Sequence, residues 1–381
     1  MGRLPAALAV LLLAGCSMFG GDDEELQPSP LVDFSPTVNV KEIWRVSVGD
    51  GAELPMRGLR PAYAEGTVYA AAADGRIKAI ELETGKVSWT VDLELPITAG
   101  PGLGDGILVV GTADGAVIAL ERAGGAQRWR AEVSSEVLAP PAIDTGMTVV
   151  RAQDGRVFGF RSEDGSRAWV YDQSVPLLTL RGSSPPLIRG GFVYLGFDNG
   201  KVASLRLSDG AVRWEETVAV PQGRTELERI VDIDGPMAVV ASDLYAVSFQ
   251  GLLAAITADA GRLLWVKDMS SFTGLAVART QLFVSDADDS VWALDRLSGG
   301  TLWRQDRLAR RSLSAPAAHG EYVVVGDFEG YLHWLEEDTG EFVARARAGG
   351  SAVTAQPLAL GPILVVQTQG GRVVAYRLGS S

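Results

Sequence analysis

The side chains that could carry out catalysis or bind a metal are few. The chain has two histidines, His319 and His333, so a histidine-rich metal site is excluded and a serine–histidine–aspartate triad is disfavoured. Asp286, Asp288 and Asp289 are close enough in sequence to ligate calcium, but they also occupy the position of a hairpin turn, and we favour the turn. Neither a phosphate-binding loop nor a nucleophile elbow is present. We therefore expect no catalytic residues, no resident metal and no cofactor.

The chain's one cysteine, Cys16, has surroundings that mark it for lipid attachment. A basic residue precedes an apolar stretch, Leu4 to Leu13, which has about half the length needed to span a bilayer. Residues 13–16, Leu-Ala-Gly-Cys, fit the bacterial lipoprotein pattern, in which the cysteine is lipidated and becomes the first residue. We expect residues 1–15 to be a cleaved signal peptide; the alternative is a free thiol behind an ordinary cleavage site. Ser17, in place of aspartate, favours sorting to the outer membrane.

The overall charge limits the other partners that the chain can have. A formal charge of −13 argues against nucleic-acid binding and against electrostatic adhesion to anionic lipid, so membrane attachment has to come from the lipid on Cys16. Residues 16–40 combine acidic residues, prolines and glycines with little periodicity, which predicts a flexible tether. We expect the folded part of the chain to cover residues 41–381.

Past residue 40 the sequence repeats, and the repeat defines the elements that must position any functional residue. Residues 73–89, ADGRIKAIELETGKVSW, and residues 153–169, QDGRVFGFRSEDGSRAW, are two of seven copies. Each clear copy has a turn glycine, an alternating strand and, 14 residues after that glycine, a tryptophan. In the sixth copy Asp289 stands at the turn glycine's position, and in the seventh Ala344 replaces the tryptophan. Asp-Gly between alternating runs predicts a two-residue hairpin, and four strands per repeat indicate a propeller blade.

The two ends of the repeat region complete each other. Residues 369–378, QGGRVVAYRL, supply an eighth turn and strand but no tryptophan strand, whereas residues 41–48, KEIWRVSV, supply a tryptophan strand with no turn before it. The sequence therefore predicts an all-β fold: an eight-bladed β-propeller of four-stranded antiparallel blades, the last of them closed by the N-terminal strand. Such closure pairs strand edges that would otherwise be free.

The recurrent tryptophans have two interpretations. They could stack on ligands, or each could dock its blade against the next, and their fixed position in every copy favours docking. The tryptophans assigned to blade docking are Trp44, Trp89, Trp129, Trp169, Trp214, Trp265 and Trp303.

Two long connections in consecutive copies are the candidate binding surface. The distance from the tryptophan to the next turn glycine is 31 residues from Trp169 to Gly200 and 37 residues from Trp214 to Gly251, against 24 to 27 in the shorter copies. Both connections follow the same strand of their repeat, so we expect them side by side on one face. Loops on a rigid scaffold commonly carry recognition.

The residues of these connections fit a protein interface. Residues 176–182, PLLTLRG, place Leu178 and Leu180 on one side of an extended segment, next to Arg181. Residues 228–236 likewise place Asp232 and Asp234 on one side. The carboxylates could orient Arg181 or meet a basic partner. The alternative is that the leucines belong to the core and the aspartates to turns.

The repeat itself is shared with enzymes. The pattern Ala-x-Glu-x-x-Thr-Gly-x-x-x-Trp, from Ala79 to Trp89, resembles the repeat of quinoprotein propellers. Those dehydrogenases are longer and commonly carry an adjacent cysteine pair, which this chain lacks, and no part of the chain resembles their cofactor and calcium constellation. A quinoprotein-like periplasmic enzyme and an envelope-ligand-binding propeller are the alternatives to a protein-binding scaffold.

A more specific resemblance covers essentially the whole chain. The lipoprotein signal, LTLRG (178–182), VDIDG (231–235) and GDFEGYLHWL (326–335) resemble the BamB family, lipoproteins of the outer-membrane β-barrel assembly machinery. The resemblance implies a non-catalytic scaffold, anchored by lipid in the outer membrane and facing the periplasm. It would dock on the periplasmic repeat domains of the central barrel component and aid the folding and insertion of nascent outer-membrane proteins.

The same resemblance assigns the docking residues. The matching positions in this chain are Leu178, Leu180, Arg181, Asp232 and Asp234. A weaker expectation is that exposed strand edges bind unfolded clients by strand addition.

Overall fold

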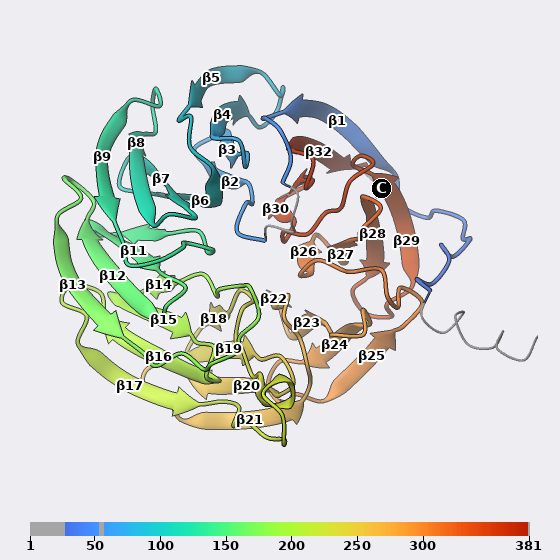
Figure 1. The fold of residues 1–381 in the computed structure, drawn as a ribbon. Coiled ribbons are helices and arrows are strands. Elements are labelled where there is room, and N and C mark those ends of the chain that lie inside the picture. The colour runs from blue at the N-terminus through green and yellow to red at the C-terminus, as the bar shows by residue number, and fades with distance from the viewer. Residues whose placement is uncertain (1–26, 53–56, 380–381) are drawn as a thin grey trace, which may run out of the picture.

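The computed structural model describes residues 27–52 and 57–379, and over these ranges the chain forms a ring of eight four-stranded sheets around a central axis (Figure 1). Every pairing within the sheets is antiparallel, and in seven sheets the strands follow chain order from the axis to the rim. The remaining sheet has the order β1-β32-β31-β30, so the first strand of the chain closes the last blade. The expected eight-bladed propeller and its closure are confirmed.

The blades are numbered in chain order. The first four consist of β2 (Ala62–Ala64), β3 (Thr67–Ala71), β4 (Arg76–Glu81) and β5 (Val87–Asp92); β6 (Ile97–Gly104), β7 (Ile107–Thr112), β8 (Ala116–Glu121) and β9 (Gln127–Glu132); β10 (Ala142–Asp144), β11 (Met147–Arg151), β12 (Arg156–Arg161) and β13 (Arg167–Asp172); and β14 (Leu187–Arg189), β15 (Phe192–Gly196), β16 (Lys201–Arg206) and β17 (Val212–Thr217).

The last four blades consist of β18 (Ala238–Val240), β19 (Asp243–Val247), β20 (Leu252–Thr257) and β21 (Leu263–Asp268); β22 (Leu275–Ala278), β23 (Gln281–Ser285), β24 (Val291–Asp295) and β25 (Thr301–Gln305); β26 (Ala317–His319), β27 (Tyr322–Gly326), β28 (Tyr331–Glu336) and β29 (Phe342–Arg347); and β30 (Leu358–Leu360), β31 (Ile363–Gln367) and β32 (Arg372–Leu378) with β1 (Val40–Ser47). One 3-10 turn, η2 (Leu227–Arg229), lies between the fourth and fifth blades.

The turn between the second and third strands of a blade, such as β3 and β4, differs from the two-residue turn that we expected. In the first blade the Ala72 N–H donates to the Arg76 carbonyl at 2.8 Å and the Gly75 N–H donates to the Ala72 carbonyl at 3.2 Å, which makes a three-residue loop. Only its last residue is left-handed, and Asp289 (φ 63°) takes that conformation in the sixth blade, as its place in the repeat requires. In the fifth blade Gln250 (φ 47°), one residue before the glycine, is the left-handed residue.

The recurrent tryptophans join each blade to the next. Each indole lies on the outer strand, and its Nε1–H donates to a backbone carbonyl of the following blade. The seven pairs are Trp44 with Leu82, Trp89 with Arg122, Trp129 with Ser162, Trp169 with Leu207, Trp214 with Ala258, Trp265 with Arg296 and Trp303 with Glu337. Inter-blade packing therefore accounts for their repetition.

The second glycine of the repeat receives the tryptophan of the preceding blade. A Cβ at Gly165 would lie 2.7 Å from the indole of Trp129, and Gly165 has a φ of +72°. Any other residue would therefore meet both a steric clash and a strained backbone. This contact explains why the repeat keeps a glycine four residues before each tryptophan.

The seventh blade exchanges the large and small partners of this interface. In the other blades the tryptophan pairs across the ladder with a small residue, as Trp129 does with Ala119, whereas in the seventh Trp334 on β28 pairs with Ala344 on β29. Trp334 is fully buried, and its ring meets that of Tyr376 in the eighth blade edge to face at 5.9 Å. Trp334 thus supplies the bulk that Ala344 lacks, a compensation that we did not expect from the sequence.

Part of the expected tether is bound to the ring. The Ser29 N–H donates to the Ala309 carbonyl, Phe34 stacks on Phe342 at 5.6 Å, and the Val38 N–H donates to the Val343 carbonyl at 3.2 Å. We had expected a flexible tether up to residue 40, but residues 29–38 of that segment contact the ring. Cys16 and residues 1–15, the expected signal peptide, lie outside the described residues, and no helix within the described residues is long and apolar enough to cross a membrane.

Both histidines are structural and buried in the seventh blade. His319 Nδ1 accepts the Trp334 indole N–H at 3.1 Å, and His333 Nε2 lies 3.0 Å from an Asp327 carboxylate oxygen. Burial lowers the pKa of both imidazoles, and for His333 this effect exceeds the opposing pull of Asp327. Neither side chain is free to ligate a metal or act as a base.

We expect these histidines to make stability depend on pH. Because their folded pKa values lie below the unfolded value of about 6.5, the two histidines bind more protons in the unfolded chain, and the stability that they contribute is lost as the pH falls below that value. Each histidine contributes a slope of up to about 1.4 kcal/mol per pH unit. Urea unfolding at pH 7, 6 and 5 measures the slope, and His319→Gln should reduce it. An equal slope in that variant would contradict the assignment.

Candidate functional site

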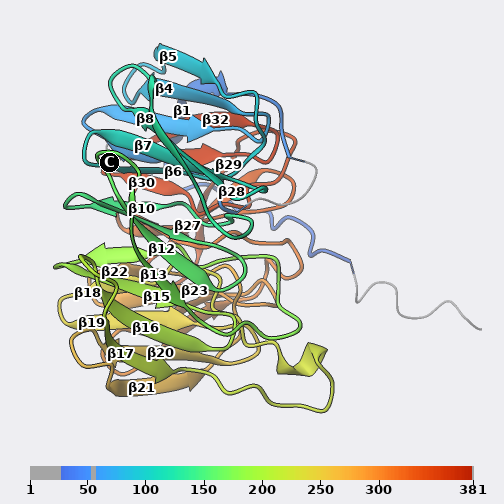
Figure 2. The same cartoon turned by 60° about the vertical axis from the view of Figure 1, so that its left-hand side comes forward.

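Two long connections stand out from the ring and lie against each other. We call residues 173–186, between β13 and β14, the first excursion, and residues 218–237, between β17 and β18, the second excursion. The Leu180 N–H of the first donates to the Asp232 carboxylate of the second at 2.5 Å, and the Ser184 hydroxyl donates to the Gly235 carbonyl at 3.0 Å. As expected from their equal strand position, both occupy one face, where η2 projects as the yellow-green coil of Figure 2.

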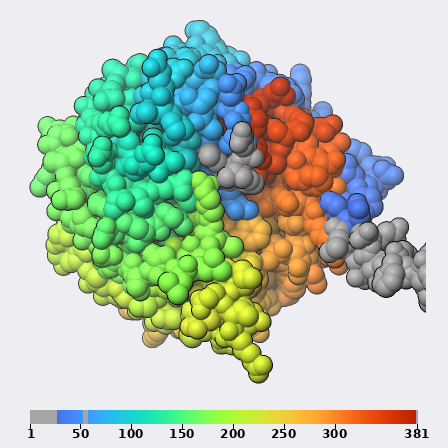
Figure 3. All heavy atoms as spheres, in the orientation of Figure 1, coloured from blue at the N-terminus to red at the C-terminus, as the bar shows by residue number. Residues whose placement is uncertain are grey.

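The first excursion exposes apolar side chains at its tip. Leu177 is 95% exposed and Leu178 38% exposed, whereas Leu180 is partly buried. The two leucines named from the sequence are thus accessible to different extents, and the most exposed leucine, Leu177, was missed because it lies on the other side of the alternating pattern. In the second excursion, on the same face, Leu227 is 67% exposed. The lime-green and yellow surfaces that carry these segments adjoin in Figure 3.

Arg181 makes an intramolecular contact that differs from the one we expected. Its guanidinium pairs with the Glu136 carboxylate, from the connection between β9 and β10, and not with the two aspartates. The side chain stays 43% exposed, so its outer face is open to a partner. Arg181 therefore links the first excursion to the neighbouring blade while presenting positive charge on the same face.

Asp232 and Asp234 are both buried, and Asp234 reaches only the axial cavity. The Ile233 N–H donates to the Phe197 carbonyl and the Phe249 N–H to the Asp232 carbonyl, so this stretch runs between the turns of two blades and is buried on both sides. Desolvation raises the pKa of Asp232 to about 7, although the Leu180 N–H opposes the rise. The role of Asp232 is to hold the backbone of the first excursion at Leu180.

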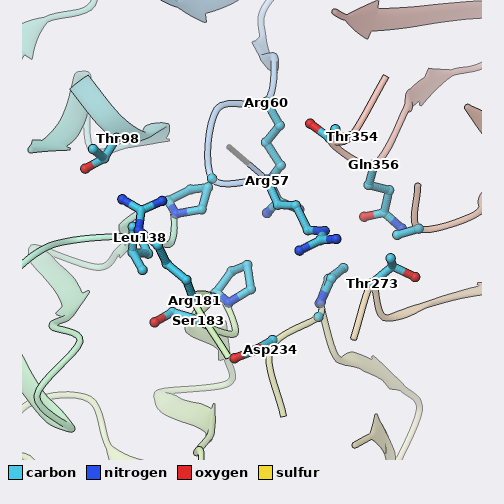
Figure 4. A pocket seen from close by; sticks show the side chains of 17 residues that line it. Arg57, Arg60, Thr98, Leu138, Arg181, Ser183, Asp234, Thr273, Thr354 and Gln356 are labelled. Carbon is cyan, nitrogen blue, oxygen red and sulfur yellow. The ribbon is translucent and has the colours of Figure 1, made fainter. Parts of the chain in front are cut away.

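A cavity at the axis lies directly beside these residues. Figure 4 shows Arg60 on one side of it, Arg181 and Asp234 on the other and Arg57 between them. Thr354 and Gln356 also line it. The guanidinium of Arg57 lies over the ring of Phe272, 4.7 Å from its centroid. The axis is therefore lined by both signs of charge, and Asp234 belongs to the cavity and to the second excursion at once.

The acidic turn of the sixth blade has a structural use. Asp289 accepts the backbone N–H groups of Ser312 and Leu313, and Asp286 accepts those of Asp288 and Ser290. Their carboxylates therefore satisfy backbone donors of the turn and of the next connection. This agrees with the turn interpretation that we favoured over calcium.

The fold and the site together define a β-propeller in which long connections after two neighbouring blades lie side by side on one face. The family model for "Outer membrane protein assembly factor BamB" matches residues 39–96, 73–305 and 288–379. The BamB of Pseudomonas aeruginosa is 49% identical over 375 residues, which cover 98% of each chain. The chain belongs to the BamB family, whose members are outer membrane protein assembly factors and not enzymes.

Solved structures agree with this placement. The crystal structure of BamB from Moraxella catarrhalis superposes with a TM-score of 0.82 at 30% identity, covering 89% of this chain and all of that one. A quinohemoprotein alcohol dehydrogenase from Comamonas testosteroni also superposes, with a TM-score of 0.70 at 14% identity over 90% of this chain and 77% of that one. The second likeness concerns the fold alone, which explains why the repeat resembled that of quinoproteins.

Proposed function

We propose that the protein is held by lipid on Cys16 at the periplasmic surface of the outer membrane, where it serves the assembly machinery as a docking scaffold. Its partner is the central barrel component, contacted through the periplasmic repeat domains of that component. Lipid anchoring raises the effective concentration of the propeller near the machinery. Docking then aids the folding and insertion of outer-membrane β-barrel proteins.

The observation that carries the proposal is the construction of the first excursion. Its leucines Leu177 and Leu178 are exposed although the segment is pinned on three sides: by Asp232 at Leu180, by Glu136 at Arg181 and by Gly235 at Ser184. A preorganised loop loses little conformational entropy on binding. Apolar anchors beside an arginine are the composition that binding hot spots favour.

Contact with nascent outer-membrane proteins is the second part of the proposal. Outer strands of other blades carry charges at their edges, such as Arg128 and Arg130 on β9. The outer strand β21 exposes Leu263, Leu264 and Val266 over most of its length and carries its charges, Lys267 and Asp268, only at its end. An apolar edge strand can pair with an extended apolar segment of another chain, which supports strand addition at this blade.

Photocrosslinking in cells tests the docking face. We expect a probe at Leu177 to capture the central barrel component, whereas a probe at Gly124 should not, because Gly124 lies in the β8–β9 hairpin, at the opposite end of the outer strands from the excursions. A Cβ at Gly124 meets no atom within 4 Å, so the control probe fits without disturbing the fold. Capture of another envelope protein from Leu177, or equal capture from Gly124, would contradict the proposed docking face.

A further inference from the structure

Three carboxylates from two blades converge behind the docking face. Asp198 lies in the turn between β15 and β16, and Asp232 and Asp234 lie in the second excursion. One oxygen from each carboxylate lies within 4.8 Å of one from each of the others. Three oxygens bound to one divalent cation have separations of this size, since each metal–oxygen distance is about 2.1 to 2.6 Å.

The three carboxylates are buried and incompletely satisfied. Their residues are 2%, 0% and 9% exposed, for Asp198, Asp232 and Asp234 respectively. Among the described residues no hydrogen-bond partner reaches Asp198 Oδ2, Asp232 Oδ1 or Asp234 Oδ1. Leaving a buried carboxylate oxygen unpaired is unfavourable, and each of the three carboxylates in the cluster has one such oxygen.

The protein cations near the cluster do not balance its charge. Arg151, which is fully buried, forms an ion pair with Asp198 and also acts at longer range on Asp232 and Asp234, while its Nε and Nη1 have no hydrogen-bond partner among the described residues. Its single positive charge faces three carboxylates. Arg57, across the axial cavity, forms no ion pair within 4.0 Å among the described residues and lies over Phe272 instead.

We propose that Asp198, Asp232 and Asp234 bind a divalent cation of the hard class, Ca²⁺ or Mg²⁺. The ligands are all carboxylate oxygens, with no sulfur and no imidazole, which is the set that these ions prefer. Two uncompensated negative charges match one divalent ion. Asp234 lines the axial cavity, so the ion can enter from solvent and keep water in its remaining coordination positions.

The cation would act on the docking face through Asp232, and this consequence rests on the proposed function. One oxygen of Asp232 holds the Leu180 N–H while the other is free to face the ion. Bound cation therefore fixes the carboxylate that pins the first excursion. Removal of the ion should loosen Leu180 and its neighbours without disturbing the blades.

Calorimetric titration of the EDTA-treated full chain with CaCl₂ and, separately, with MgCl₂ tests the site. We expect one ion per chain for at least one of the two salts, together with a higher melting temperature in that salt. Asp198→Asn, which lies outside both excursions, should weaken binding about tenfold or more. The control Asp288→Asn, in the acidic turn of the sixth blade, should bind as the wild type does.

The outcomes separate this proposal from the docking proposal. The cation proposal is overturned if the wild-type chain gives neither heat nor a shift in melting temperature up to about 5 mM of either salt, which is about five times the weak limit of extracellular calcium sites. The cluster would then hold protons and water. Undiminished binding in Asp198→Asn would also overturn it. Crosslinking from Leu177 that persists in EDTA-treated protein would leave the docking face intact while removing the coupling between ion and loop.

Discussion

Trp129→Ala should lower the free energy of unfolding by about 3–5 kcal/mol, the usual cost of removing a buried tryptophan. The indole is almost fully buried, its N–H donates to the Ser162 carbonyl at 2.9 Å, and its ring lies 6.2 Å from that of Phe160. Truncation would open a cavity between the second and third blades and leave a buried carbonyl unpaired. Urea unfolding followed by circular dichroism measures the loss.

Trp129→Phe is the matched control for that substitution. Phenylalanine retains most of the ring that covers Gly165 but cannot donate to Ser162, so we expect a smaller loss, about 1–3 kcal/mol. A loss below about 1 kcal/mol for the alanine variant would mean that the blades hold together without this contact. The repeated glycine would then need a different explanation from the packing of the indole against it.

Arg181→Glu should weaken binding to the periplasmic repeat domains of the central barrel component by about tenfold or more, without lowering the melting temperature. The substitution reverses an exposed charge and breaks the pair with Glu136, which is a surface contact of small energetic value. Binding measured by calorimetry with the purified domains gives the change. Wild-type affinity in the variant would contradict the role of Arg181 in docking.

Two further variants sharpen this result. Glu136→Arg combined with Arg181→Glu restores the internal pair with its charges exchanged, so binding recovers if Arg181 acts by positioning the loop and stays weak if its charge meets the partner. Arg377→Glu is the matched control, because Arg377 forms a similarly exposed pair with Glu83 on another part of the ring. We expect it to bind as the wild type does.

The fold could be read from the sequence because the repeat encodes it several times over. A turn glycine, a docking glycine and a tryptophan recur in fixed order, and the incomplete ends at Trp44 and at residues 369–378 required ring closure. The exchange between Trp334 and Ala344 was not predicted from the sequence. The two residues compensate in volume because they are paired on neighbouring strands, and only the strand register shows that pairing. The predicted hairpin type was wrong because Asp-Gly is compatible with both two-residue and three-residue loops.

The site was read less completely, since its residues lie outside the repeat. Alternation correctly placed Asp232 and Asp234 on one side of their segment, but it could not tell which side faces the interior. That depends on pairing with the turns at Phe197 and Phe249, which are distant in sequence. The same holds for the ion pair of Arg181 with Glu136 and for the approach of Asp198 to Asp232 and Asp234. Both join residues that are distant in sequence and meet only because the blades are neighbours in the ring, so the local sequence does not predict them.

The contacts of residues 29–38 with the ring also determine how the molecule responds to a pulling force. A protein held in a membrane by its N-terminal end and by a partner on its face is pulled along the chain toward β1, the strand that closes the ring. The contacts of Ser29 with Ala309 and Arg311, and of Val38 with Val343, take up this pull before it reaches β1. Under the anchoring proposed above, any remaining force acts along the β1–β32 ladder, whose hydrogen bonds share the load, and the ring stays closed.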